Sequence, residues 1–213
     1  MTLPAAAQVI ADAAGLGVVL SLRQAERLLG FAALLLRWNR SFNLISRQDQ
    51  NRLYERHLLD SLCLAPWLEG GPVLDLGTGA GLPGIPLAIA REDLQFLLAD
   101  RNARRIRFVE RAVRELAIGN ARARCVDAAQ IDEPGAFGCV VSRAVTDLAT
   151  LWRLAAPLLA ARGVLLVLHS VQQAVREDAA RLGDSVTAEI REVEVPGRGV
   201  QRIVRISRRQ ELE

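Results

Sequence analysis

The sequence contains no lysine: all 27 of its basic side chains, spread over 213 residues, are arginines. A bias in the base composition of a GC-rich genome is the simplest cause. The consequence is that every basic contact of this chain uses a guanidinium group, which binds phosphate through a planar fork of donors and stacks on bases. With 24 acidic side chains the formal net charge is only +3, so a strongly basic surface has to be local.

Cysteine is also scarce. The three cysteines, Cys63, Cys125 and Cys139, are isolated and have no spacing typical of a metal site. An odd number of isolated cysteines fits reduced thiols in a cytosolic protein and argues against a disulfide framework. The sequence also lacks a zinc-binding spacing, a P-loop and a Ser-His-Asp order. Aromatic residues make up only 4% of the chain, so we expect a core of Leu, Val, Ile and Ala.

Long apolar segments are missing as well. The longest apolar runs, at 28–36 and 154–168, are short or interrupted, whereas a membrane-spanning helix needs about 20 apolar residues. The first 15 residues have no basic region and include Asp12, unlike a secretory signal. We therefore expect a cytoplasmic protein without a membrane partner. The length fits one α/β domain with an appendage.

The most informative stretch is VLDLGTGAGLPG, residues 73–84. An apolar run ends in an acid, glycines alternate at Gly77, Gly79 and Gly81, and Leu-Pro-Gly opens a helix. This is the pattern of the first strand, turn and helix of a nucleotide-binding α/β domain. The GxGxxG spacing that ends at Gly84 fits a dinucleotide site. The acid followed by GxGxG is instead typical of S-adenosylmethionine (SAM) methyltransferases, and a glycine turn without a ligand is a third interpretation.

Residues 1–70 are predicted to form a helical extension. A capping-box pattern that begins at Ser21 starts a helix that runs to Trp38. The polar-aromatic segment 38–45 has no helical period, so we expect a loop or a helix boundary there. A second helix is predicted over residues 51–67.

Residues 71–213 are predicted to form the α/β domain, because strands and helices alternate from a Gly-Gly-Pro turn onward. The last two strands flank a Pro-Gly-Arg-Gly turn and are expected to form an antiparallel hairpin. We predict a mostly parallel seven-stranded sheet with helices on both faces and an antiparallel C-terminal end. The predicted strands are 73–76, 95–100, 121–126, 137–142, 163–168, 185–195 and 200–207, and the predicted helices are 82–90, 102–116, 147–159 and 171–182.

Asp100 ends the second predicted strand, about 20 residues beyond the glycine turn. An acid at this place accepts hydrogen bonds from both ribose hydroxyls of an adenosine, in NAD and in SAM alike. Capping of the following helix is the alternative role for this side chain.

The helix predicted over residues 102–116 has one apolar face and one arginine-rich face, each repeating at helical spacing. Residues 101–124 hold eight arginines and two glutamates, a local charge of +6 that exceeds the charge of the whole chain. A polyanion that bound here would release counterions, so the arginine face is a candidate for nucleic-acid binding. A solvated face with i,i+4 pairs to glutamate is the alternative. The candidate RNA-binding residues are Arg101, Arg104, Arg107, Arg111 and Arg114.

Three further polar residues are candidates for chemistry. Arg143 follows the fourth predicted strand, and the carboxyl ends of strands line the binding crevice of open α/β sheets. It is expected to hold a ligand carboxylate or phosphate, with an ion pair to an acid as the alternative. His57 and Asp60 stand at i and i+3 on one predicted helix, which suggests acid–base work or a buried, hydrogen-bonded histidine at the domain junction.

Five sequence features occur together and in a fixed order. They are Trp38-Asn39 with Asn43-Leu44, RHLLDS at 56–61, DLGTGAGLPGIPL at 75–87, RIRF at 105–108 and VSRA at 141–144. Together they resemble the ribosomal RNA small subunit methyltransferase G family, also called glucose-inhibited division protein B. Members of this bacterial family transfer a methyl group from SAM to N7 of one guanine, guanine 527, in the 530 loop of 16S rRNA.

The resemblance implies a Rossmann-like class I SAM-dependent methyltransferase fold, SAM as the cofactor, and 16S rRNA or the 30S subunit as the partner of a monomeric enzyme. It implies that Gly77 and Leu82 line the SAM site, that Ala128 and Ala129 lie at the adenine, and that Arg143 completes the site. The full set of expected cofactor-binding residues is Asp75, Gly77, Gly79, Gly81, Leu82, Asp100, Ala128, Ala129 and Arg143.

Guanine N7 has a lone pair and no proton to remove, so positioning residues are expected rather than a general base. The residues expected around the guanine are Asn39, Asn43, His57, Asp60 and Arg143. Two positions depart from the family pattern: His169-Ser170 stands where the family often has Lys-Gly, and Ala103-Arg104 where it has Gly-Lys. The first departure leaves His169 as a candidate for substrate contact, and the second keeps the charge.

Three other functions stay open. An NAD-dependent oxidoreductase needs a substrate domain, but only about one helix and a hairpin follow the fifth predicted strand. A SAM-binding ribosome-assembly factor would hold RNA without modifying it. A small-molecule methyltransferase would leave the arginine face without a role.

Overall fold

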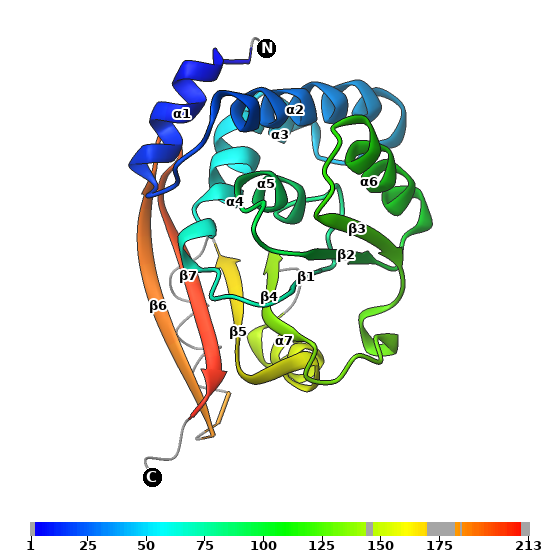
Figure 1. The fold of residues 1–213 in the computed structure, drawn as a ribbon, viewed down its shortest axis with the longest axis vertical. Helices are drawn as coiled ribbons and strands as arrows, with labels where there is room; N and C mark the ends of the chain where they lie inside the picture. Colours follow the sequence, from blue (N-terminus) through cyan, green and yellow to red (C-terminus); the bar gives the residue numbers. More distant parts are fainter. Residues whose placement is uncertain (1–2, 144–146, 170–181, 184, 210–213) are drawn as a thin grey trace.

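The computed structural model describes residues 3–143, 147–169, 182–183 and 185–209. Its centre is a sheet of seven strands in the order β3-β2-β1-β4-β5-β7-β6 (Figure 1). The first five strands along the chain are parallel, and β7 runs antiparallel to β5 and β6. The predicted sheet is confirmed. The strands are β1 (Val73–Leu76), β2 (Phe96–Asp100), β3 (Ala121–Cys125), β4 (Phe137–Arg143), β5 (Leu159–His169), β6 (Val186–Val195) and β7 (Gly199–Arg208).

Helices cover both faces of the sheet, because its parallel strands are buried on both sides. Val73 and Val141 belong to one hydrophobic cluster, while their neighbours Leu74 and Val140 belong to a second cluster that includes helix α7. The helices are α1 (Ala6–Gly15), α2 (Leu22–Phe42), α3 (Arg47–Gln50), α4 (Asp60–Leu62), α5 (Gly84–Ala90), α6 (Ala103–Glu115) and α7 (Leu148–Ala155), with a π-helical turn η1 (Tyr54–Leu59) and 3₁₀ turns η2 (Ala65–Trp67), η3 (Ala128–Gln130) and η4 (Ala156–Leu158).

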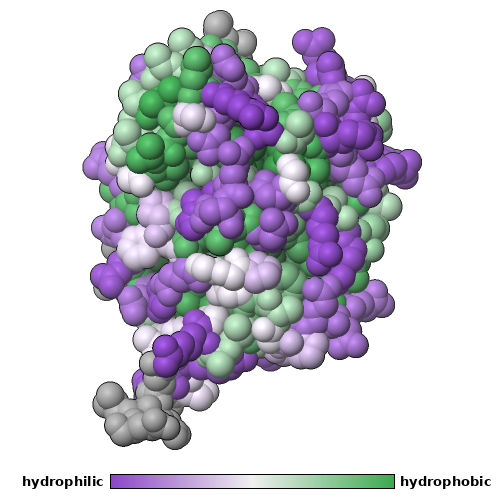
Figure 2. All heavy atoms as spheres, viewed as in Figure 1, coloured by the Kyte–Doolittle hydropathy of each residue, from purple (hydrophilic) through white to green (hydrophobic). Residues whose placement is uncertain are grey.

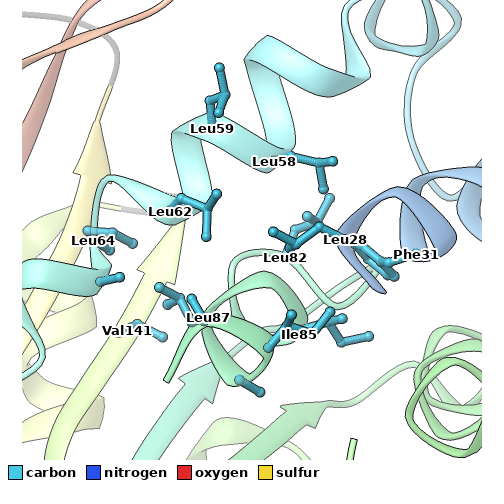
Figure 3. Packing of buried hydrophobic residues seen from close by; sticks show 14 of the residues in the cluster. Leu28, Phe31, Leu58, Leu59, Leu62, Leu64, Leu82, Ile85, Leu87 and Val141 are labelled. Carbon is cyan, nitrogen blue, oxygen red and sulfur yellow. The ribbon is translucent and has the colours of Figure 1, made fainter. Parts of the chain in front are cut away.

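The N-terminal helices pack onto the sheet domain through the first of these clusters. Figure 3 shows Leu28 of α2 and Leu58 of η1 near Leu82, which precedes α5, and Val141 of β4 beside Leu87 of α5. One continuous cluster therefore joins the helical extension to the sheet. The division of the chain at residue 70 stays a prediction about its organisation.

In residues 1–70 two predicted helices differ from the observed ones. Helix α2 continues through the expected loop to Phe42, because Trp38 and Phe42 stack at i,i+4 with ring centroids 5.0 Å apart. Asn43 then ends the helix in the left-handed conformation, at φ 47°. The helix predicted over 51–67 is instead a π-helical turn, a short α-helix and a 3₁₀ turn that contains Pro66.

Two further predicted elements begin at other residues in the structure, and a third cannot be compared with it. Helix α5 begins at Gly84 rather than at residue 82, after a series of turns. Strand β5 begins four residues earlier than predicted, because Leu159 already pairs with Phe137 of β4 across an irregular register. The helix predicted over 171–182 falls almost wholly outside the described residues.

Candidate functional site

The glycine turn connects β1 to α5 and opens at the carboxyl edge of the sheet. The N–H groups of Gly77 and Thr78 both donate to the carbonyl of Ala99 on β2, at 2.9 Å. A Cβ at Gly77 would meet no neighbouring atom, whereas a Cβ at Gly84 would lie 2.3 Å from Leu98 and 2.5 Å from the Asp75 carboxylate. The early glycines of the motif therefore face open space, and Gly84 allows α5 to pack against the sheet.

The side chain of Asp75 stabilises the turn from its buried side. Its side chain is fully buried, and Oδ2 accepts hydrogen bonds from Thr78 Oγ1 at 2.5 Å and from the Gly84 N–H at 2.8 Å. Burial raises the pKa of Asp75 to about 6, although both hydrogen bonds act in the opposite direction. The structure thus gives this acid a supporting role in the turn, and its expected contact with the cofactor stays a prediction.

Asp100 links the turn to the start of α6. Its Oδ2 accepts from the Gly79 N–H at 2.9 Å and its Oδ1 from the Asn102 N–H at 2.8 Å. The alternative role as the cap of α6 is wrong, because Asn102 caps this helix by accepting from the N–H groups of its first turn. The carboxylate is left at the rim of the turn, where the predicted ribose contact needs it.

A cavity of about 330 Å³ lies at the carboxyl ends of β1, β2 and β3. This volume falls in the range of small-molecule sites, and the carboxyl edge is where open α/β sheets bind their ligands. The predicted cofactor residues Gly77, Asp100 and Ala128 line it. Asp127 and Arg105 line it too and were missed, although an acid directly after β3 is the same signal that singled out Asp100.

Other predicted cofactor residues lie beside this cavity rather than on its wall. Leu82 is buried in the cluster of Figure 3, and a Cβ at Gly81 would collide with Ile85. The N–H of Ala129 donates to the Asp127 carboxylate at 3.0 Å. The contacts of these residues with a cofactor stay predictions.

Arg143 and His57 meet next to the glycine turn. Because Asp75 of β1 pairs with Val141 of β4, Arg143 reaches the same edge of the sheet as Gly77. Arg143 Nη1 donates to His57 Nδ1 at 2.6 Å, so the ring proton of a neutral imidazole lies on Nε2, which is 4.0 Å from Asp49 Oδ2. Asp49 was not predicted, and no sequence pattern marks it.

His57 is neutral in this setting. Burial and, after it, the positive charge of Arg143 lower the pKa of His57 to about 3, against the weaker attraction of Asp49. Burial also lowers the pKa of Arg143, while Asp75, Asp60 and Asp49 act to raise it. The prediction that His57 is buried and hydrogen-bonded is confirmed, while its place at a domain junction stays a prediction.

Asp60 has a different partner from the one expected. Its Oδ2 accepts from Nε of Arg198, on the turn between β6 and β7, at 3.3 Å, and no hydrogen bond joins it to His57. Burial raises the pKa of Asp60 to about 6, opposed by Arg198. Three buried atoms here lack a partner within the described part of the chain: His57 Nε2, Asp60 Oδ1 and Asp75 Oδ1. Such unpaired buried groups are uncommon, and a catalytic role or a bound water or ion is among their explanations.

The two asparagines expected at the guanine lie apart from this cluster. Both ends of the buried Asn39 amide bond to the backbone of Ile45, at 2.8 and 3.1 Å, and hold the chain after α2 in place. Asn43 is exposed and lines a second cavity, of about 610 Å³, between the end of α2 and the start of α6. Their contact with a base stays a prediction.

The arginine face of α6 is exposed as predicted, and Figure 2 shows hydrophilic side chains over the region where Figure 1 draws α6. Arg111 pairs with Glu115, but no pair joins Glu110 to Arg114 in the structure. Among the described residues, no ion-pair partner is found for Arg101, Arg104, Arg107 or Arg114. Arginines without ion-pair partners are suited to an anionic partner.

The fold and the site define a class I SAM-dependent methyltransferase. Geranyl diphosphate methyltransferase in complex with SAM superposes with a TM-score of 0.55 at 13% identity, covering 76% of this chain and 88% of that chain. A SAM-dependent O-methyltransferase from Thermotoga maritima gives 0.55 at 16% identity, covering 72% and 66%. At these identities the two structures establish the fold alone.

The sequence comparisons narrow this class to one family. The family model of rRNA small subunit methyltransferase G (GidB) matches residues 24–201. Proteins named ribosomal RNA small subunit methyltransferase G are 44% identical in Methylococcus capsulatus over 177 residues, 82% of this chain and 84% of that protein, and 41% identical in Xanthomonas campestris over 179 residues, 81% of both. The chain belongs to the rRNA small subunit methyltransferase G family. No helix among the described residues is long and apolar enough to span a membrane.

Proposed function

We propose that this protein transfers the methyl group of SAM to N7 of guanine 527 in the 530 loop of 16S rRNA. One observation supports this most directly: a cavity of adenosine size at the glycine turn has Arg143 and His57 at the same sheet edge. Family membership supplies the substrate. We further propose that the enzyme works as a cytoplasmic monomer on the 30S particle, where its substrate is assembled.

The residues present fit SAM. The Asp100 carboxylate is fixed at the rim of the turn by Gly79 and is placed to accept from ribose hydroxyls, while Ala128 and Asp127 form the wall beyond it. The open space before Gly77 leaves room for a ligand against the backbone. When bound, SAM supplies a methyl group on a positively charged sulfur.

The protein's own contribution is positioning. Guanine N7 has a free lone pair, so no side chain has to remove a proton. His57 suits such a site, since its Nδ1 already accepts from Arg143 and its pKa is far below neutral. Arg143 keeps further N–H donors for a guanine oxygen or a phosphate, and the unpaired Asp60 Oδ1 is an acceptor for a base N–H. Holding N7 in line with the methyl group is the main requirement.

The test is methylation of a defined substrate. The protein is incubated with SAM labelled on its methyl group and with 30S subunits or naked 16S rRNA from a strain without this modification, and the labelled base is mapped. We expect label at N7 of guanine 527. SAM binding without transfer would favour an assembly factor, and binding of NADH but not of SAM would favour an oxidoreductase.

Alanine variants test the residues around the guanine. Arg143→Ala is expected to lower the transfer rate about 100-fold, because misplaced reacting groups have effects of this size. Arg153→Ala, an exposed arginine on α7, is the matched control and should be unaffected. Unchanged rates for alanine at all of Asn39, Asn43, His57, Asp60 and Arg143 would contradict the assignment.

A further inference from the structure

The second cavity forms what we call the α2–α6 groove. It is lined on one side by Phe42, Asn43 and Leu44, and on the other by Asn102, Ala103, Arg104, Arg105 and Arg107. The lining contains three guanidinium groups and no acid. A groove of this composition attracts a negatively charged ligand and repels a cationic one.

One wall of the groove is an exposed aromatic ring with rigid support. Phe42 is 39% exposed, and its ring stacks on Trp38 at an interplanar angle of 30°. Trp38 in turn packs on Phe108 of α6, with centroids 5.6 Å apart, and Phe108 is fully buried. A ladder of rings therefore runs from the core to the surface and holds Phe42 in place. Single-stranded nucleic acids stack their bases on such rings.

The arginines of the groove are available for phosphate. Arg104 and Arg107 are exposed and form no ion pair with any described residue. Their backbone position is fixed, because Asn102 caps the helix that presents them. An aromatic ring on one wall and arginines on the other provide contacts for both a base and its neighbouring phosphates.

The groove borders the cofactor cavity. Arg105 lines both, and its Nη1 lies 3.6 Å from the Asp100 carboxylate. A strand lying in the groove would thus pass beside the cofactor cavity, on the side of Asp100. A protein partner would not need this proximity.

We infer that the α2–α6 groove binds a single-stranded RNA segment next to the target guanine, with one unstacked base on Phe42 and neighbouring phosphates on Arg104 and Arg107. The inference rests on the proposed function, in which RNA is the substrate. Paired RNA is excluded from this mode, because the faces of its bases are covered by their neighbours in the helix.

The test compares variants at saturating and limiting RNA. Phe42→Ala is expected to raise KM for RNA about ten-fold, since one base–aromatic stack has an effect of this order, while kcat and the affinity for SAM stay unchanged. Phe42→Trp should restore KM. Arg104→Gln with Arg107→Gln should lower the slope of log affinity against log salt by about 1.4, at about 0.7 per phosphate contact.

Arg23→Gln, an exposed arginine at the opposite end of α2, is the control and should match the wild type. Circular dichroism and thermal unfolding show that each variant is folded. The inference is overturned if Phe42→Ala behaves like Arg23→Gln. It is also overturned if the variant weakens activity on 30S particles but binds an unpaired oligoribonucleotide normally, which would indicate a protein contact. A wild type that methylates no RNA refutes the proposed function instead.

Discussion

His57 and Arg143 are 86 positions apart in the sequence and touch in the fold. The contact is unusual because a guanidinium donates to an imidazole that is itself buried. It is possible because the histidine stays neutral, so its lone pair is free to accept, and because the nearby acids balance the charge of Arg143. At this scale the chemistry of the site depends on burial as much as on residue type.

The depressed pKa of His57 predicts a pH-dependent stability. The unfolded chain protonates this histidine near 6.5 and the folded protein only near 3, so its contribution is complete above about pH 6.5 and is lost as the pH falls. The stability advantage of the wild type over His57→Gln should shrink by about 2 kcal/mol between about pH 7 and about pH 5. Urea unfolding at both pH values measures it.

Asp60 and Asp75, whose pKa values are raised, act in the opposite direction between about pH 4 and pH 6 but are common to both proteins. Their contributions therefore cancel in the stability difference between the wild type and His57→Gln. A ring NMR titration of His57 with a midpoint near 6.5 would contradict the prediction.

Asp100 is expected to control SAM affinity. Asp100→Asn keeps an oxygen for the Gly79 N–H but loses the charge and the second acceptor that ribose hydroxyls need. We expect the dissociation constant of SAM to rise at least about ten-fold, by the loss of one charge-assisted hydrogen bond. Calorimetry on this variant and on Asp132→Asn, an exposed acid outside the cavity, measures the effect. Equal affinities would remove Asp100 from the site.

At the scale of elements, the glycine turn is where strands β1 and β2 meet helices α5 and α6. Asp75 at the end of β1 holds the start of α5, and Asp100 at the end of β2 holds the middle of the turn. The shape of the turn is thus set by carboxylates on neighbouring strands and not by the glycines alone. Close packing at Gly84 also holds the start of α5 against the sheet.

Gly84→Ala should therefore damage stability. Its Cβ would overlap Leu98 and Asp75, and overpacking of this kind lowers the free energy of unfolding by about 1 to 3 kcal/mol. Gly119→Ala is the control, because nothing lies within 4 Å of a Cβ there. Thermal unfolding of both variants measures the difference. A melting temperature for Gly84→Ala equal to that of the control would show that the packing around Gly84 adjusts to an added methyl group.

At the scale of the whole molecule, the C-terminal hairpin returns to the N-terminal part of the chain. Arg198 reaches Asp60 across 138 positions, and the Arg52 guanidinium donates to the carbonyl of Gly197 at 3.4 Å. The turn between β6 and β7 is therefore attached to residues 52–60 beside the site. Among the described residues, the buried Asp60 carboxylate receives its hydrogen bond from this hairpin.

Arg198→Ala is expected to lower the methylation rate without weakening SAM binding. The change leaves Asp60 buried without its cation, which raises its pKa further and removes its fixed orientation. Arg191→Ala is the control: this arginine on β6 is exposed and, among the described residues, pairs with Glu189 two positions away. Single-turnover rates measured over a range of pH values separate loss of charge on Asp60 from loss of folding. An unchanged rate would show that Asp60 needs no partner.

The sequence was enough to predict the sheet, and the edge of it that is expected to bind the cofactor, because the signals for both are local. Strand periodicity, alternating glycines and an acid at a strand end are all readable within a few residues. The sequence did not predict that α2 would continue to Phe42, because the Trp38–Phe42 stack and the packing on Phe108 of α6 override a polar segment without a period.

The sequence by itself determined the class of fold, the glycine turn, Asp100 and the charged face of α6, because each follows from short-range pattern and composition. Only the tertiary structure decided that Arg143 bonds His57, that Asp60 pairs with Arg198, that Asp49 completes the cluster and that Arg105 joins two cavities. These contacts connect residues far apart in the chain. They depend on how whole elements pack and on which charges are left buried, and neither is encoded in local spacing.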